Sequence, residues 1–227
     1  MRQRKSDIRK AVQRLLRRHQ TAAASRKKFR TLAEQAKPVL LPLTYGAALK
    51  SLEDKDAMFS SARLIKQTSF DYRRTHPDIK RFHARMIKEL NARKIPFFPF
   101  EFYRDPERQA QLYKQGVSRA KGGSSPHQYG CAVDLVSVTR YWDLTRIEWA
   151  AIGALGKEVA RKLNIKVTWG GDFSTLYDPA HWELENWRDY QRATSVYIDE
   201  FGEPLDFGDN YFFQLDQIIK RKSSRNA

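Results

Sequence analysis

The sequence contains one cysteine, Cys131, and this scarcity excludes an intrachain disulfide framework. It does not distinguish an oxidising compartment from a reducing one, because a protein without disulfides can work in either. Long hydrophobic runs are also lacking, since no stretch approaches the roughly 18 uninterrupted apolar residues of a membrane span. The 227 residues are enough for one sizeable domain with appendages, or at most two small domains.

Acidic residues are scarce in the first 30 positions, where Asp7 stands against twelve lysines and arginines. Most of the net charge of +16 therefore lies in this segment, which predicts a basic amphipathic helical arm over residues 1–36. The arm is either a solvated helix that packs a narrow apolar stripe on the domain, or a surface attracted to polyanions such as nucleic acid, anionic lipid or a bacterial envelope. The apolar stripe consists of Ile8, Val12, Leu15 and Leu16.

The arm shares its basic, acid-poor composition with some targeting sequences. A secretory signal needs an apolar core of roughly 7 to 15 residues, and Arg14, Arg17 and Arg18 interrupt every candidate core here. We therefore expect no signal peptide. An organellar transit peptide, which is also arginine-rich and poor in acids, is an alternative for the same segment.

Helices and strands are predicted along the rest of the chain. Residues 37–60 are expected to form a linker with a short helix, because prolines and a glycine interrupt the apolar runs. Apolar residues at helical spacing predict helices over residues 77–94 and 146–163. Between them, Asp105-Pro106 begins a further helix and Gly116 ends it.

Aromatic and β-branched residues predict strands over residues 95–103, 131–138 and 165–169, with Pro99 at a bulge or a sheet edge. His76 and His83 are assigned to structure or surface, since neither has companions that could be metal ligands.

One short stretch, residues 125–134, places a nitrogen ligand and a carboxylate ligand on a segment hinged by glycine. Gly130 permits a sharp turn after His127, and the alternation of side chains along the following strand turns Asp134 away from Cys131. His181 offers a second imidazole. Together these residues would give three protein ligands to a catalytic zinc ion, with one position left open.

Two carboxylates flank this second imidazole in the sequence, and each is a candidate general base. Asp178 lies three residues before His181, near enough to accept a proton from water at the metal. Glu183 lies two residues after it. Cys131 is a further alternative, because a thiolate four residues after His127 could itself bind zinc.

Four separated motifs occur in one order along residues 75–186. They are Phe102-Tyr103-Arg104 with Glu107-Arg108-Gln109 and Leu112-Tyr113-x-x-Gly116, then Ser125-x-His127-x-x-Gly130-x-Ala132-x-Asp134, Trp169-Gly-Gly-Asp172 and Asp178-x-x-His181-Trp-Glu183. In this order they resemble the zinc peptidases of bacterial cell-wall turnover: the D-Ala-D-Ala carboxypeptidases, the vancomycin-resistance dipeptidases and the L-alanyl-D-glutamate endopeptidases found as phage lysins.

The resemblance implies an α+β fold of the Hedgehog and DD-peptidase kind, in which helices back a small antiparallel sheet. It places the zinc peptidase domain at residues 61–186 and leaves residues 187–227 as a C-terminal extension. Zn²⁺ is the implied cofactor. The implied partner is peptidoglycan, with an anionic envelope surface as a further partner of the basic arm, and we expect a monomer.

The resemblance also assigns roles to the site residues. Phage-type endopeptidases tend to carry Asp where Asp178 stands and Phe or Trp then Glu after the histidine, whereas the carboxypeptidase branch tends to carry Glu at the first position. Asp178 is therefore the expected base, and Glu183 is expected to orient His181. Arg104 is expected to hold a substrate carboxylate or the oxyanion, with a plain surface salt bridge as the alternative. Ser125, Gln109 and Trp182 are expected to bind substrate or support the ligands.

These expectations predict a zinc-dependent peptidoglycan peptidase, an L-alanyl-D-glutamate endopeptidase like those of phage endolysins. The alternatives are a D-Ala-D-Ala carboxypeptidase and a zinc-containing binding module without activity. A polyanion binder that engages nucleic acid ranks third, because the sequence shows none of the recognised nucleic-acid modules. We expect the chain to be made in the cytoplasm without a signal peptide and to act at the cell wall.

Overall fold

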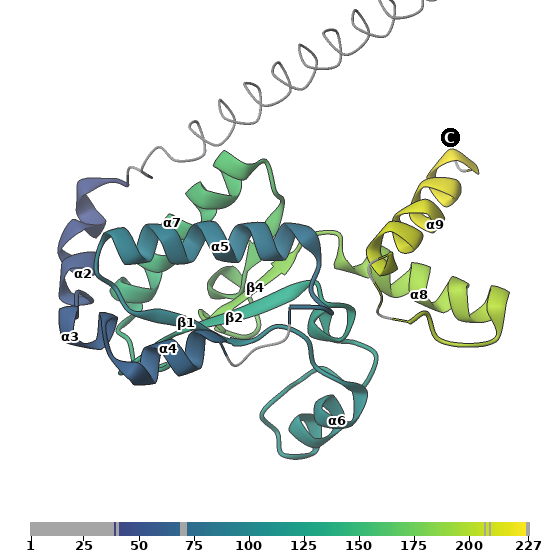
Figure 1. Ribbon diagram of the computed structural model, residues 1–227, viewed down its shortest axis with the longest axis horizontal. Helices are drawn as coiled ribbons and strands as arrows, with labels where there is room; N and C mark the ends of the chain where they lie inside the picture. Colours follow the sequence, from purple (N-terminus) through teal and green to yellow (C-terminus); the bar gives the residue numbers. More distant parts are fainter. Residues whose placement is uncertain (1–38, 40, 69–71, 207, 209, 226–227) are drawn as a thin grey trace, which may run out of the picture. The chain divides into compact units, whose positions relative to one another are not determined.

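The fold is built on a four-stranded antiparallel sheet. The computed structural model describes residues 39, 41–68, 72–206, 208 and 210–225 (Figure 1), and the arm predicted over residues 1–36 lies outside them. The strand order is β1-β2-β4-β3, so β1 is an edge strand. Its register shifts between Pro99 and Glu101, which confirms the predicted bulge. The strands are β1 (Phe97–Glu101), β2 (Ala132–Ser137), β3 (Val167–Trp169) and β4 (His181–Leu184).

Two long helices, α5 (Pro77–Ala92) and α7 (Arg146–Leu163), pack against each other and against the sheet. Each begins at a capped end, because the His76 imidazole accepts a hydrogen bond from the Asp78 amide and Thr145 forms a capping box with Glu148. The fully buried core between helices and sheet includes Ile79, Phe82, Met86, Leu90, Val133, Leu135, Ile152, Leu155 and Trp182.

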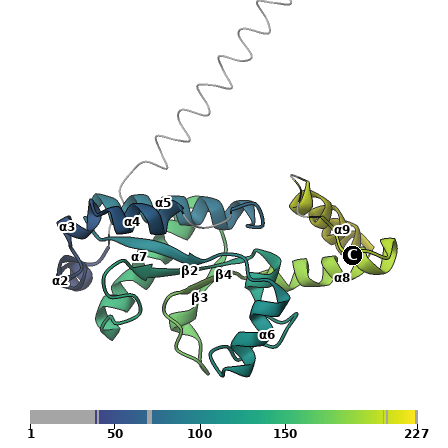
Figure 2. The ribbon, with the colours of Figure 1, turned by 60° about the horizontal axis from the view of Figure 1, so that its bottom comes forward.

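This arrangement confirms the predicted α+β fold, with helices backing a small antiparallel sheet. Figure 2 shows α5 along one side of the sheet and α6 (Pro106–Lys114) on the other. The side chains of a strand alternate between the two faces of the sheet. Those on the face that α5 and α7 leave uncovered are therefore the ones that can form a site.

Short helices occupy much of residues 43–58 and contribute to the core, although we expected a linker with a single short helix over residues 37–60. Ala48 and Leu49 are buried in the same core, and the helix that carries them, α2 (Gly46–Ser51), packs against α7. The difference arises because each helix is too short to present a recognisable apolar period. The elements are η1 (Leu43–Tyr45), α2 (Gly46–Ser51), α3 (Lys55–Met58) and, after them, α4 (Ser61–Thr68).

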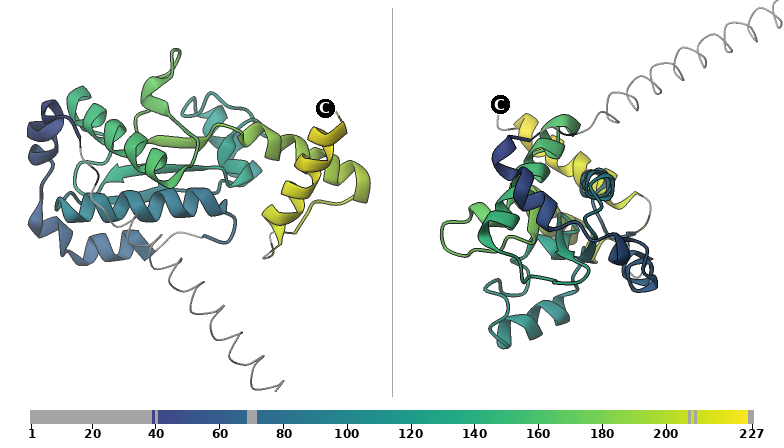
Figure 3. Two further views of the ribbon diagram at one scale, coloured as in Figure 1. Left: turned by 90° about the horizontal axis from the view of Figure 1, so that it is seen from above. Right: turned by 90° about the vertical axis from the view of Figure 1, so that its left-hand side faces the viewer.

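The C-terminal extension begins with α8 (Trp187–Phe201), against which α9 (Tyr211–Arg225) packs (Figure 3). It is anchored to the rest of the fold by a hydrogen bond of 2.8 Å between the Tyr190 hydroxyl and His76 Nε2. The predicted domain boundaries stay a prediction. Across the part of the chain that the structure describes, every helix is too short or too polar to cross a membrane.

Candidate metal centre

The register of the two central strands brings Asp134 and His181 together. Asp134 on β2 pairs with His181 on β4, and residues directly opposite in an antiparallel pair project to the same face. Asp134 Oδ1 lies 3.0 Å from His181 Nδ1. Two groups separated by 47 positions in the chain thus become neighbours through backbone pairing alone.

His127 reaches the same point from η2 (Pro126–Tyr129), a short 3₁₀ helix that ends at Gly130. Gly130 has a φ of +64°, and a Cβ there would lie 1.9 Å from the carbonyl oxygen of Arg74, so this turn requires glycine. His127 Nε2 lies 3.3 Å from Asp134 Oδ1 and 3.2 Å from His181 Nδ1. The predicted trio therefore meets at one place.

Hydrogen bonds behind the two imidazoles fix which nitrogen faces the centre. His127 Nδ1 lies 2.8 Å from the carbonyl oxygen of Phe102, to which it donates, so Nε2 keeps its lone pair. His181 Nε2 lies 3.0 Å from Glu183 Oε2 and donates to that carboxylate, which leaves the Nδ1 lone pair facing the centre. Such outer partners orient metal-binding histidines and raise their basicity.

The donor set fits a divalent metal ion such as zinc. The three donor atoms are separated by 3.0, 3.2 and 3.3 Å, and ligands at about 2.0–2.1 Å in a tetrahedral zinc site lie roughly 3.3 Å apart. The described residues offer His127, Asp134 and His181 as a group of potential metal ligands. Three protein donors leave one tetrahedral position open, as catalytic zinc sites do.

The electrostatics of the group also favour a cation at its centre. Burial alone lowers the pKa of His181, but its hydrogen bonds to the carboxylates of Asp134 and Glu183 outweigh burial and raise the pKa to about 10. The negative surroundings that favour a second proton on this ring would equally stabilise a metal cation at Nδ1. Burial raises the pKa of Asp134, but the two imidazoles lower it by more. The pKa of this carboxyl therefore lies far below its ordinary value. The carboxylate is thus ionised and stabilises positive charge beside it.

Asp178 stands beside this group with its pKa raised, first by burial and then by the charge of Asp134. Its position depends on Gly170, because the Asp178 amide donates to the Gly170 carbonyl at 3.1 Å and a Cβ on Gly170 would lie 2.2 Å from the Asp178 carbonyl oxygen. The Asp178 carbonyl in turn accepts from the His181 amide at 3.1 Å. A carboxylate with a raised pKa is better matched to general-base chemistry near neutral pH.

Arg104 lies on the same side, held by two neighbours. Its Nε donates to Glu101 Oε2 at 2.7 Å, and its Nη1 donates to Gln109 Oε1 at 2.9 Å. Nη2, which also donates to Glu101, lies 3.7 Å from Asp134 Oδ2. The Arg104 side chain is 11% exposed, so it is not a freely solvated surface group.

Gln109 and Ser125 support the centre from behind. Gln109 is fully buried and joins Arg104 to the loop after α6 through a hydrogen bond of 2.9 Å to the Ser118 hydroxyl. Ser125 is buried at the start of η2, where the Gln128 side chain accepts from its amide at 3.4 Å. Both therefore shape the backbone around the candidate ligands.

Trp182 and Cys131 are not brought to the centre. The alternation along β4 turns Trp182 into the core, where its ring packs against Trp169 and Phe82. Cys131 is fully buried with Sγ 3.3 Å from the carbonyl oxygen of Tyr129, and burial raises its pKa well above the ordinary value. A buried, protonated thiol behaves as a small apolar side chain.

Three contributors to the centre were not predicted from the sequence. Glu101 fixes Arg104, the Phe102 carbonyl fixes His127, and Trp187 Nε1 donates to Glu183 Oε1 at 3.2 Å. Only Glu101 carried a signal, since an acidic residue three positions before an arginine at a strand end can pair with it. A carbonyl contact cannot be recognised in a sequence.

Comparison with known proteins identifies relatives of this chain. A model of the D-alanyl-D-alanine carboxypeptidase family matches residues 118–184. The peptidoglycan L-alanyl-D-glutamate endopeptidase CwlK of Bacillus subtilis is 30% identical over 128 residues, covering 48% of this chain and 72% of that protein. The crystal structure of the Serratia marcescens L-Ala D-Glu endopeptidase ChiX has a TM-score of 0.44 and 31% identity, covering 59% of this chain and 92% of that one.

Proposed function

Because this chain belongs to the peptidase family of the D-alanyl-D-alanine carboxypeptidases and L-alanyl-D-glutamate endopeptidases, we propose that it hydrolyses the L-alanyl-D-glutamate bond in the stem peptide of peptidoglycan, with zinc as cofactor. The observation that carries the proposal is the convergence of His127, Asp134 and His181 beside Asp178. The endopeptidase named for this bond in Bacillus subtilis supports the choice of bond.

His127, Asp134 and His181 would hold the metal ion through Nε2, a carboxylate oxygen and Nδ1. When bound, zinc supplies Lewis-acid chemistry, which polarises a carbonyl and lowers the pKa of water to about 7. Glu183 and the Phe102 carbonyl keep both imidazoles in the tautomer that this role needs.

Asp178 would act as the general base. Its carboxylate accepts a proton from the attacking water, and it then gives that proton to the nitrogen of the leaving amine as the amide bond breaks. The raised pKa suits both halves of this transfer, because a more basic carboxylate accepts the proton more readily and its protonated form is still acidic enough to release it.

Arg104 would stabilise negative charge near the reacting carbonyl. Its guanidinium lies 3.7 Å from Asp134 and is oriented by Glu101 and Gln109. A donor fixed in advance loses little free energy to reorganisation when the oxyanion develops. In the alternative role it holds a substrate carboxylate.

Digestion of purified peptidoglycan tests the proposal. Mass spectrometry should find stem peptides that begin with a new free amine on glutamate, and the products should disappear when zinc is removed and return when it is restored. Release of free D-alanine instead would establish the carboxypeptidase alternative. Bound zinc with no new amine of either kind would establish a binding module and refute the enzymatic proposal.

Action at the cell wall, as in lysis by phage endolysins, and binding of the basic arm to an anionic envelope belong to the same proposal. They predict that the full chain lyses bacteria when it is added to cells whose membrane has been made permeable. Intact turbidity under those conditions, with active enzyme, would count against this setting.

A further inference from the structure

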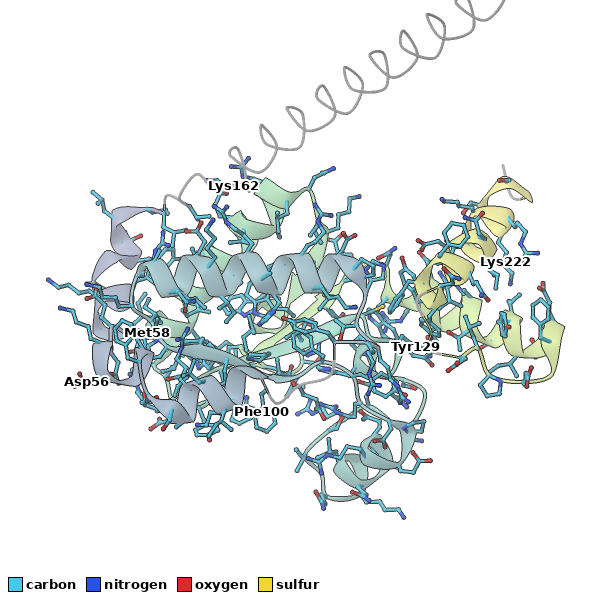
Figure 4. The ribbon with its side chains drawn as sticks, in the orientation of Figure 1. Asp56, Met58, Phe100, Tyr129, Lys162 and Lys222 are labelled. Atoms are coloured by element: carbon cyan, nitrogen blue, oxygen red, sulfur yellow. The ribbon has the colours of Figure 1, made fainter. Side chains whose placement is uncertain are left out.

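Three aromatic side chains, one from β1 and two from the turn after β2, are exposed together. Phe100, Tyr141 and Trp142 are 45%, 39% and 44% exposed, and we call them the aromatic platform. Phe100 and Trp142 meet edge to face with ring centroids 4.7 Å apart, and the rings of Tyr141 and Trp142 lie in nearly parallel planes. Figure 4 shows Phe100 below β1, next to α4.

The platform is rigidly supported from beneath. Phe98, which is nearly buried, contacts the rings of Phe100 and Tyr141. The Lys66 ammonium lies 4.4 Å from the Tyr141 ring centroid and donates to the Val138 carbonyl at 3.0 Å. The exposed rings are therefore held in place and lose little freedom when a ligand packs on them.

Tyr141 adopts a backbone conformation that bulky residues avoid. Its φ is +52°, and it is kept there by backbone hydrogen bonds in both directions with Ser137. Residues other than glycine and asparagine rarely adopt this left-handed backbone region, and such backbone strain is concentrated at binding and catalytic sites. The strained turn places two aromatic rings side by side at the surface.

The platform rests on a residue, Phe98, that belongs to the same face of the sheet as the candidate metal centre. Phe98 pairs with Val136 on β2, so both project to one face of the sheet. Val136 follows Asp134 by two positions, and it therefore lies on the face of Asp134 at a distance of about 7 Å along the strand. A ligand that extends from the metal centre along β2 would meet the platform next.

The proposed substrate has a sugar at that distance. L-alanine is joined to the lactyl group of N-acetylmuramic acid, so a single residue and a short spacer separate the proposed scissile bond from the glycan. An extended residue spans about 3.5 Å, which places the sugar within roughly two such lengths of the bond. The D-Ala-D-Ala bond at the other end of the stem peptide lies several residues further from the sugar.

We infer that the aromatic platform binds the N-acetylhexosamine rings of the glycan strand while the stem peptide occupies the metal centre. The axial C–H bonds of a hexose carry partial positive charge and pack on the electron-rich face of an aromatic ring. The inference rests on the proposed function, and it predicts that the enzyme prefers stem peptides that are still attached to glycan.

Binding of peptide-free glycan to the full chain tests the platform without relying on hydrolysis. Oligomers of alternating N-acetylglucosamine and N-acetylmuramic acid are titrated calorimetrically into the wild type and into Trp142→Ala and Phe100→Ala. Each variant should bind about two- to tenfold more weakly, the loss expected from one aromatic contact. Phe213→Ala is the matched control, because Phe213 is 63% exposed on α9, and it should bind as the wild type does.

A wild type that does not bind the oligomers, or platform variants that bind as tightly as the wild type, would overturn the inference. Circular dichroism melting checks that each variant is folded. Binding of anionic vesicles or self-association that is lost in Trp142→Ala, without any glycan binding, would assign the platform to a membrane or to a second copy and would equally overturn it.

An assay of hydrolysis on two substrates distinguishes failure of this inference from failure of the proposed function. The KM of Trp142→Ala should increase for a disaccharide-linked stem peptide and stay unchanged for the same peptide without sugar. If the wild type cleaves neither substrate, the proposed function fails while the glycan titration still decides whether the platform binds sugar. An equal rise of KM for both substrates would overturn the role of the platform.

Discussion

Gly170→Ala should damage catalysis far more than it damages folding. Gly170 is buried at the turn before the last ligand, and an added Cβ would lie 2.2 Å from the Asp178 carbonyl oxygen and 3.1 Å from the His181 Cβ. Relief to an ordinary contact of about 3.5 Å requires the Asp178 backbone to move by roughly 1 Å. That backbone carries the proposed base, and its carbonyl oxygen accepts a hydrogen bond from the His181 amide.

The magnitude of both effects follows from this displacement. Overpacking of this kind costs about 1–3 kcal/mol in the free energy of unfolding, and a misplacement of about 1 Å in a catalytic group costs roughly a hundredfold in rate. We therefore expect kcat/KM on a stem peptide to fall by about two orders of magnitude. Urea titration should record only the modest loss of stability.

Gly156→Ala is the matched control for this change. A Cβ on Gly156 would lie 2.2 Å from the Trp182 ring, so the overlap is equally severe, but it falls on the core face of the sheet. We expect a comparable loss of stability with a much smaller loss of activity. A Gly170→Ala protein with the rate and stability of the wild type would refute the claim that this turn positions Asp178.

The remaining predictions concern the donors, the base and the surrounding polar groups. His127→Ala removes a proposed ligand, so atomic absorption should find little zinc in the purified protein; retention of one ion per chain would contradict the assignment. Asp178→Asn should keep the metal and lower kcat by at least about a hundredfold, and full activity with bound metal would exclude Asp178 as the base. Trp187→Phe removes the N–H that holds Glu183, so metal affinity in a competition assay should fall by about ten- to a hundredfold, whereas unchanged affinity would make this contact irrelevant to the centre. Burial lowers the pKa of His83 to about 4, below the ordinary value of about 6.5, so the unfolded chain binds more protons in that range and the free energy of unfolding should fall by up to about 3 kcal/mol as the pH decreases from 7 to 4; equal urea midpoints at both pH values would contradict this.

Much of the fold could be predicted because its signals are local. The helix predicted over residues 146–163 coincides with α7, and the helix predicted from Pro77 is α5, since capping residues mark where both begin. Strand alternation also predicted that Asp134 faces away from Cys131, and the structure has Cys131 in the core. The family resemblance was confirmed by comparison with known proteins.

The rest depends on contacts that are distant in sequence. β4 has only four residues, His181–Leu184, too few to give a recognisable period, and its pairing with β2 is decided by the packing of the whole sheet. The resemblance marked Trp182 for the site, yet alternation along β4 turns it into the core, where its neighbours are aromatic. The contribution of Trp187 was missed because it comes from the extension, whose helices the sequence did not reveal.

The position of the candidate ligands on the central strands has a physical consequence for how the centre tolerates change. β2 and β4 are each paired on both sides, so neither can slide without breaking two ladders. A slip of either strand by one residue would turn its own ligand, Asp134 or His181, to the core face. His127 and Asp178 come from turns whose glycines leave no room for a Cβ. The donors are therefore positioned before any substrate arrives, which is the condition under which buried charge aids catalysis instead of only costing desolvation. Exposed groups around the centre are then the ones that can adapt to a substrate. Substitutions that change substrate specificity should therefore occur in the aromatic platform and in the loop after α6, and not in the metal ligands.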